Sequence, residues 1–263
     1  MSRARLSAFI VVVLFRSLIL PSFAGDEYVQ PQFLAGRILD KVPNPDKLLF
    51  TFRRSAQVTN EITSVSCDYF SPDGSMAVAE KFVYDQDALS SFEIDQFQIG
   101  AKGSGAVVVD KNDPLKRRLV LKWTTTHDGK SETKSSSEYL RNDTLVSDMI
   151  PGFIVKHWDE LAGGKEVAFR CIIPSRLETV GFELVKDSET DWHGKKVLRL
   201  RMKASNFFAA RLVAPIFFLV ESEPAHRVLE YTGRTAPKLR KGKKWRDLDA
   251  RVISDWQTAR PRP

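Results

Sequence analysis

Residues 205–220, SNFFAARLVAPIFFLV, form a nearly continuous apolar run with a single charge, Arg211. The run is too short for a membrane span, which needs about 20 apolar residues, and Pro215 interrupts it. The serine or asparagine at its start can cap a short helix, which Pro215 would end. Residues 216–220, IFFLV, are β-branched and aromatic, so they predict a buried strand. The run therefore predicts a helix followed by a strand, around which the rest of the chain is organised.

The chain on both sides of this run has the pattern of strands separated by turns. Residues 61–70 alternate apolar and polar side chains, and Ser-Pro-Asp-Gly at 71–74 is a β-turn signal. The strand pattern of 118–126 ends at His-Asp-Gly-Lys, 127–130, and the return strand, 131–140, is almost wholly polar. A strand with so little to bury is predicted to lie at the edge of a sheet.

About a dozen strands are predicted, without the alternation of strands and helices that is typical of parallel sheets. The predicted fold is therefore mainly β, with one large antiparallel sheet in which strands pair with their sequence neighbours. Sheets this wide curl, so we expect a half-barrel or barrel with two helices in or across its concave side. One helix begins the 205–220 run, and the other opens at Pro151 and ends at Gly163-Gly164. Residues 33–39 can hold a further short helix.

The first 24 residues have the regions of a secretory signal peptide. Two arginines precede an apolar core at residues 6–14, and a second apolar stretch follows Arg16 at residues 18–20. Ser-Phe-Ala at 22–24 provides the small residues of a cleavage site. An uncleaved membrane anchor is disfavoured because Arg16 would lie within the span, at a cost of about 2.5–3.5 kcal/mol. We expect an exported protein, periplasmic or secreted and soluble after cleavage, in which residues 25–263 form a single β-rich domain.

Composition limits the class of partner. The chain has 40 basic and 33 acidic residues, a net charge of +7. Three basic residues belong to the leader, so 37 basic residues remain against 33 acidic ones, an excess of 4. An exported chain with so mild an excess is not expected to bind nucleic acid. The expected macromolecular partner is an anionic membrane surface or another component of the cell envelope.

The chain has two cysteines, Cys67 and Cys171, and both lie on the apolar sides of strand patterns. An exported compartment permits oxidation, and a disulfide that closes a loop of about 100 residues would add about 4–5 kcal/mol in the chain-entropy model. Two buried free thiols fit the same pattern. Both alternatives stay open.

No residue pattern identifies a catalytic site, a cofactor or a metal. His157 has Glu160 one helical turn away, but no second pair of ligands accompanies it. Gly103-Ser104-Gly105 lacks the spacing of a nucleophile elbow, and neither cysteine neighbours a histidine. We therefore expect a protein that is not an enzyme, with a triad of residues distant in sequence as the alternative.

Two features point instead to binding. Apolar side chains on the two helices can line a cavity for an acyl chain if the sheet closes loosely, or fill the core if it closes tightly. These side chains are Phe153, Ile154, Trp158, Phe207, Phe208 and Leu212. The second feature is a basic cluster that suits an anionic leaflet or a solvated hairpin tip. It consists of Lys238, Arg240, Lys241, Lys243, Lys244, Trp245 and Arg246.

This combination resembles the LolA/LolB-like periplasmic lipoprotein carriers, which have an unclosed β-barrel. The resemblance includes the leader, the long meander, the aromatic helix and two closing strands, LEYTGR at 229–234 and ARVIS at 250–254. The chain is also similar to uncharacterised exported bacterial proteins. The resemblance implies a curved sheet, a hydrophobic cavity covered by helices, and a lipid or lipidated ligand. The chain departs from the carriers in its greater length and in its polar strand.

The leading hypothesis is an exported, non-enzymatic protein that holds a lipid or other apolar ligand inside a curled β-sheet. One alternative is a structural or assembly factor of the cell envelope that acts through protein–protein contacts. The second alternative is a hydrolase with a triad of residues distant in sequence.

Overall fold

The computed structural model describes residues 31–41, 46–113, 115–205 and 214–260. The predicted leader, residues 1–24, lies outside the described residues. Among the described residues, no helix is long and apolar enough to cross a membrane.

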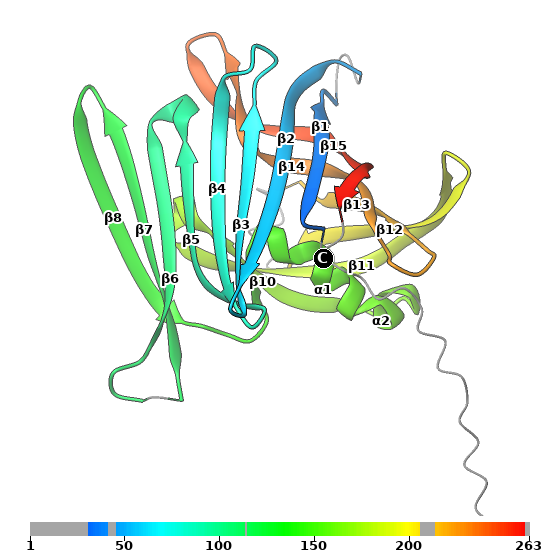
Figure 1. The fold of residues 1–263 in the computed structure, drawn as a ribbon, viewed down its shortest axis with the longest axis horizontal. Coiled ribbons are helices and arrows are strands. Elements are labelled where there is room, and N and C mark those ends of the chain that lie inside the picture. The colour runs from blue at the N-terminus through cyan, green and yellow to red at the C-terminus, as the bar shows by residue number, and fades with distance from the viewer. Residues whose placement is uncertain (1–30, 42–45, 114, 206–213, 261–263) are drawn as a thin grey trace, which may run out of the picture.

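Within these ranges, fifteen strands form one sheet (Figure 1). They are β1 (Phe33–Leu39), β2 (Leu48–Thr59), β3 (Ile62–Phe70), β4 (Met76–Asp85), β5 (Ala88–Gln96), β6 (Ala101–Val109), β7 (Arg117–His127), β8 (Lys130–Tyr139), β9 (Thr144–Leu145), β10 (Val167–Ile173), β11 (Glu178–Trp192), β12 (Lys195–Ala204), β13 (Ile216–Glu221), β14 (Val228–Lys241) and β15 (Lys244–Arg260). All neighbouring strands are antiparallel except β9 and β10. The predicted mainly-β fold with one large curled sheet is confirmed.

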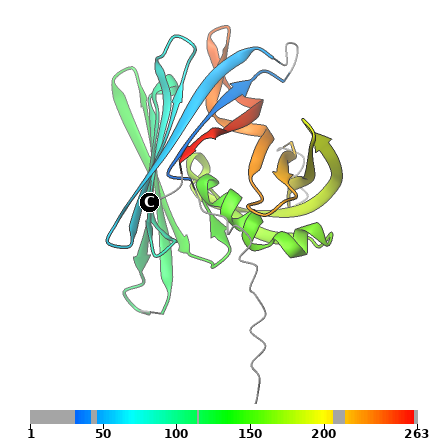
Figure 2. The same ribbon diagram turned by 45° about the vertical axis from the view of Figure 1, so that its right-hand side comes forward.

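The strands follow in the order β8-β7-β6-β5-β4-β3-β2-β1-β15-β14-β13-β12-β11-β10-β9. The sheet is thus two meanders joined by the pairing of β1 with β15, its first and last strands. Figure 2 shows strands of the N-terminal meander nearly edge-on, with the C-terminal strands curving away from them. The inner face of the sheet is the face enclosed by this curl.

Residues 33–39 form strand β1, so the helix predicted there is wrong. The strand hydrogen bonds to β2 on one side and to β15 on the other. Gly36 permits this close packing, because a Cβ at that position would lie 2.1 Å from the Phe52 ring and 2.4 Å from the carbonyl oxygen of Ile253. Pairing between distant parts of the chain therefore decides the structure of this segment.

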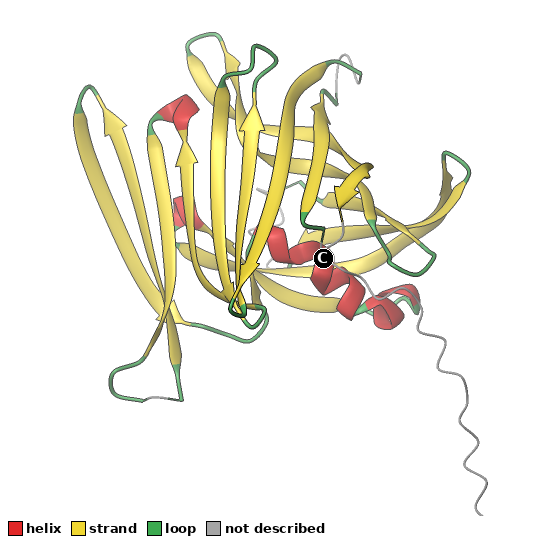
Figure 3. Cartoon of the chain, viewed as in Figure 1, coloured by secondary structure: helices red, strands yellow, loops and turns green. Residues whose placement is uncertain are grey.

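The helices lie between β9 and β10 (Figure 3). A 3₁₀ turn, η2 (Ser147–Met149), leads into α1 (Ile150–Lys156) and α2 (Trp158–Ala162). The helix predicted to start at Pro151 is therefore present, but His157, at φ −107° and ψ 22°, divides it in two. The helix predicted at the start of the 205–220 run lies largely outside the described residues. The strand predicted at 216–220 is confirmed as β13.

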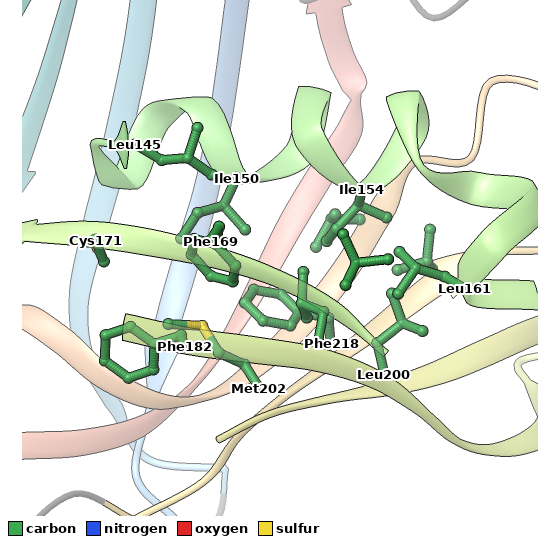
Figure 4. Packing of buried hydrophobic residues seen from close by; sticks show 14 of the residues in the cluster. Leu145, Ile150, Ile154, Leu161, Phe169, Cys171, Phe182, Leu200, Met202 and Phe218 are labelled. Carbon is green, nitrogen blue, oxygen red and sulfur yellow. The ribbon is translucent and has the colours of Figure 1, made fainter. Parts of the chain in front are cut away.

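The buried apolar side chains of the described residues form three clusters. The C-terminal cluster packs Ile150, Ile154 and Leu161 of the helices against Phe169 and Phe182 of β10 and β11 (Figure 4). The N-terminal cluster contains Val65, Phe82, Phe92, Leu119 and Leu121, and the junction cluster contains Ile38, Phe50, Val78, Ala250 and Val252. Full burial of a side chain of this size contributes about 1.5–3 kcal/mol relative to exposure.

Side chains of β8 contact the start of β11, which lies near the other edge of the sheet. Strand β8 lies at the edge, as its polar sequence predicts, and Ser136 Oγ donates to the Leu177 carbonyl oxygen at 2.5 Å. Thr179 Oγ1 donates to Glu138 Oε2 at 3.2 Å. These contacts are not strand pairing, and pairing in the described residues leaves β8 and β9 as the two edges, so the sheet is an unclosed barrel.

Candidate functional site

A row of polar side chains crosses the inner face where the three apolar clusters meet. Arg54 of β2, Cys67 of β3 and Glu80 of β4 lie opposite one another in the strand register, and all three are buried. The neighbouring positions on the same face are apolar, for example Ala56, Val65 and Phe82. Alternation along the strands therefore places two charged residues where core side chains are expected.

Arg54 forms a buried ion pair with Asp148 of η2. Arg54 Nε donates to Asp148 Oδ1 at 2.6 Å, and Arg54 Nη2 donates to Asp148 Oδ2 at 3.1 Å. Arg54 Nη1 donates to the Pro31 carbonyl oxygen at 2.5 Å, and the Tyr84 hydroxyl donates to Asp148 Oδ2 at 3.0 Å. The bidentate pair fixes η2, and so the start of α1, to the inner face of the N-terminal meander.

Glu80 has a different environment. The Tyr69 hydroxyl donates to Glu80 Oε2 at 3.2 Å, and no described residue hydrogen bonds to Oε1 of the same carboxyl. Burial raises the pKa of Glu80 to about 7; the Tyr69 bond opposes this rise and the Asp148 charge adds to it. Glu80 is therefore an acid that changes charge near neutral pH inside the protein.

Two tyrosines and a cysteine adjoin this carboxyl. Burial, followed by the charge of Glu80, raises the pKa of Tyr69 and of Tyr231. Burial also raises the pKa of the Cys67 thiol well above its usual value, with the charges of Asp148 and Glu80 adding to the effect. We call Tyr69, Glu80 and Tyr231 the interior polar centre. Its tyrosines stay protonated and its neighbouring thiol is not an activated nucleophile.

Both thiols are free in the structure. Cys67 belongs to the N-terminal cluster and Cys171 to the C-terminal cluster. Burial raises the pKa of Cys171 to about 12. Of the two alternatives left open by the sequence, the structure has the buried thiols and not the disulfide.

Four side chains that pack against the apolar clusters, two of them from the interior polar centre, are only partly buried. Tyr69 and Ile94 pack against the N-terminal and junction clusters, Tyr231 against the junction and C-terminal clusters, and Met149 against the N-terminal and C-terminal clusters. Each of these four side chains retains intermediate exposure. The apolar clusters are therefore not completely covered at these four side chains.

The helix residues predicted to line a cavity divide into two groups. Ile154 is fully buried in the C-terminal cluster, Phe153 lies 5.2 Å from Phe169 between ring centroids, and Trp158 stacks on His226 at 3.8 Å. These three side chains pack onto the sheet. The other three, Phe207, Phe208 and Leu212, lie outside the described residues.

The predicted basic cluster forms the tip of the β14–β15 hairpin. Arg234 Nη1 lies 2.6 Å from Asp247 Oδ2, and Lys238 pairs with the other oxygen of the same carboxylate. The charge of Lys238 is therefore partly neutralised. Among the described residues no ion-pair partner is found for the other basic side chains of the cluster: Arg240, Lys241, Lys243, Lys244 and Arg246. Trp245 between them is 37% exposed, and Arg240 lies 5.9 Å from the centroid of its ring.

The remaining groups have simpler environments. His157 Nδ1 lies 2.9 Å from Glu160 Oε1 on the exposed side of the helix pair. The described residues contain no group of three His, Cys, Asp or Glu side chains that could hold a metal ion.

A shallow hollow of about 510 Å³ lies on the outer face of β4–β7, and Lys81, Glu93 and Lys122 are among its lining residues. A smaller one, about 320 Å³, adjoins Phe33 and Ser55.

The sequence reasoning did not identify Arg54, Glu80 or Asp148. A signal was present for two of them, because Arg54 lies in the apolar alternation of residues 50–58 and Glu80 in that of 78–84. A charge at such a position predicts either a buried pair or a binding group. Asp148 carries no comparable signal, since it precedes a helix where acidic residues are common.

The comparisons with known proteins add one finding. No protein-family model and no curated protein matches the chain. Among solved structures, the chain is similar to a β-barrel-like protein of a domain of unknown function (DUF1849) from Brucella abortus, at 10% identity and a TM-score of 0.40. The similarity covers 87% of this chain and 95% of the other. The resemblance to lipoprotein carriers is not confirmed by these comparisons.

Proposed function

We propose that this chain is an exported, non-enzymatic binding protein that holds a lipid or other apolar ligand inside the curled sheet. The observation that carries the proposal is the incomplete burial of Tyr69, Ile94, Met149 and Tyr231, which pack against the apolar clusters around a buried carboxyl. Side chains in a finished core are nearly fully buried and leave few voids. Apolar binding sites combine such a lining with a few polar groups that fix the ligand.

The basic tip of the β14–β15 hairpin is a candidate membrane-binding surface. Five basic side chains without a described ion-pair partner surround the exposed Trp245. Basic residues near an anionic leaflet contribute about 1 kcal/mol each, and tryptophan favours the headgroup region. We infer that the tip binds an anionic membrane surface, where a carrier would collect or release its ligand.

Ligand binding should follow chain length. For the straight-chain alcohols from hexanol to dodecanol, titrated below their aqueous solubility limits, we expect the affinity to rise about fourfold per added CH₂, since each buried CH₂ contributes about 0.8 kcal/mol. Isothermal titration calorimetry measures each affinity. A plateau at the shortest alcohols, or no binding of any, would contradict an interior apolar site.

Two tryptophan substitutions locate this binding. Ile94→Trp adds bulk at the inner face and should weaken dodecanol binding at least tenfold. Val83→Trp places the same side chain in the outer hollow and should leave the affinity unchanged. If both variants are folded by circular dichroism and the outer one alone loses binding, the ligand site is the outer hollow and the proposal fails. If both variants bind dodecanol with the affinity of the parent chain, the ligand site is not in the interior and the proposal fails as well.

Membrane binding should depend on the hairpin charges. Replacing Lys241, Lys243 and Lys244 together by glutamate is expected to reduce binding to anionic phosphatidylglycerol vesicles at least about 100-fold, because the three lysines contribute about 3 kcal/mol. Vesicle co-sedimentation measures this loss. Binding of the parent chain should weaken as salt is raised.

The matched control exchanges three exposed lysines elsewhere, Lys111, Lys130 and Lys165, for glutamate. It changes the net charge equally and should lower binding far less than the hairpin variant. Equal losses in the two variants would show that net charge alone attracts the protein. Equal binding of the parent chain to neutral phosphatidylcholine vesicles would show that the tip does not recognise anionic lipid.

A further inference from the structure

We propose that the interior polar centre, Tyr69, Glu80 and Tyr231, binds the primary ammonium group of an amphiphilic ligand. This inference rests on the proposed function, because the apolar part of the same ligand would occupy the interior. It adds the chemical class of the head group and the residues that recognise it.

One carboxyl oxygen of Glu80 can accept a further hydrogen bond. The residue is 7% exposed, and the Tyr69 hydroxyl occupies Oε2. Oε1 receives no hydrogen bond from the described residues. Oε1 is not among the described side-chain atoms that are fully buried without a partner, so it keeps some exposure. A ligand that enters the interior can therefore reach Oε1 and donate a hydrogen bond to it.

The interior polar centre offers three hydrogen-bond acceptors to a ligand. Glu80 Oε1 is one, and the Tyr69 oxygen, which donates its own proton to Glu80, can still accept a bond. Tyr231 lies close enough for the Glu80 charge to raise its pKa, and no described residue hydrogen bonds to its hydroxyl. A primary ammonium group has three donors, which equals the number of these acceptors. The tyrosine rings also favour a cation over their faces.

The groups around Glu80 carry no net charge. The groups that interact with Glu80 are Cys67 and Tyr69 of β3, Asp148 of η2 and Tyr231 of β14. Arg54 of β2 and Tyr84 of β4 adjoin them through their hydrogen bonds to Asp148. Arg54 and Asp148 neutralise each other at 2.6 Å, and the thiol and the tyrosines are neutral. Ionised Glu80 therefore leaves a net charge of about −1, which a cation cancels and an anion would double. The site thus disfavours a fatty acid.

The affinity should depend on pH. Glu80 has a pKa of about 7, whereas an alkylammonium, like the lysine side chain at ~10.4, stays charged through this range. The fraction of ionised Glu80 rises about tenfold between pH 6 and pH 8. Binding of an amine should strengthen by about that factor over the same interval, while binding of an alcohol should change little.

The experiment compares four ligands that share one chain: dodecylamine, dodecanol, dodecanoate and dodecyltrimethylammonium. Calorimetric titration at pH 8 should show dodecylamine binding at least tenfold tighter than dodecanol, and dodecanoate binding weakest. The trimethylammonium ligand keeps the charge but has no N–H donor, so it should bind more weakly than dodecylamine. At pH 6 the preference for dodecylamine over dodecanol should fall about tenfold.

Two variants test the residues. Glu80→Gln should remove both the amine preference and its pH dependence, so that dodecylamine and dodecanol bind with similar affinity, and Tyr231→Phe should weaken dodecylamine binding more than dodecanol binding. Glu93→Gln, at an exposed position on the next strand, is the control and should preserve both.

The outcomes separate the two proposals. If all four ligands bind alike, or if Glu80→Gln keeps the amine preference, the interior site stands and the ammonium assignment is overturned. If none of the four binds, the proposed function fails and the ammonium site fails with it. A preference for dodecanoate would overturn the charge argument specifically.

Discussion

Replacing Asp148 by alanine is expected to lower the free energy of unfolding by about 3–5 kcal/mol, the cost of leaving one member of a buried ion pair without the other. The side chains of Arg54 and Asp148 are 7% and 5% exposed and make two hydrogen bonds to each other. Tyr84 would lose its acceptor as well. Urea unfolding followed by circular dichroism measures the change, read from the midpoint at constant slope.

Two further variants show whether the pair itself is responsible. Glu178→Ala removes a similar contact, 2.6 Å from Arg176, but with both side chains about half exposed, and should cost less than about 1 kcal/mol. The double variant Arg54→Met, Asp148→Leu removes both charges and should be more stable than Asp148→Ala. An Asp148→Ala variant no less stable than Glu178→Ala would contradict the buried pair.

Glu80→Gln is expected to stabilise the protein at pH 8 by up to about 3 kcal/mol and to have little effect at pH 5. The folded-state pKa of Glu80 is about 7, above the ordinary value of 4.5. The folded chain therefore holds a proton that the unfolded chain releases between these two values, so stability falls as pH rises through this window. Above pH 7 the penalty is complete, and glutamine, which is neutral, avoids it.

Thermal or urea unfolding at pH 5 and pH 8 tests this sign directly. The control is Glu93→Gln, an exposed position where a substitution should change stability by less than about 0.5 kcal/mol at either pH. A Glu80→Gln variant that is less stable at pH 8 would show that ionised Glu80 has a favourable partner, and the account of the interior polar centre would then be wrong.

Local pattern was sufficient to predict several elements. The polar composition of β8 predicts an edge, and β8 is an edge, because a strand with no apolar face gains nothing from burial. The β-branched and aromatic residues of β13 predict a buried strand, and β13 pairs on both sides. In each case the residues of the segment itself are sufficient to explain its position in the sheet.

Other features depend on residues far apart in the chain. Strand β1 has a sequence that fits a short helix, and its pairing with β15 is what makes it a strand. Arg54 and Asp148 are 94 positions apart, so no local pattern brings them together. The basic cluster was visible in sequence, but the neutralisation of Lys238 by Asp247 follows from the β14–β15 register.

The most direct test of an interior ligand site is a crystal structure of the protein with bromododecanol, whose bromine can be located by anomalous scattering. We predict bromine signal and chain density inside the curl, against Ile94 and Tyr231, with the hydroxyl near Glu80. Density in the outer hollow beside Lys81 and Lys122, or an interior filled by the protein's own side chains, would contradict the account.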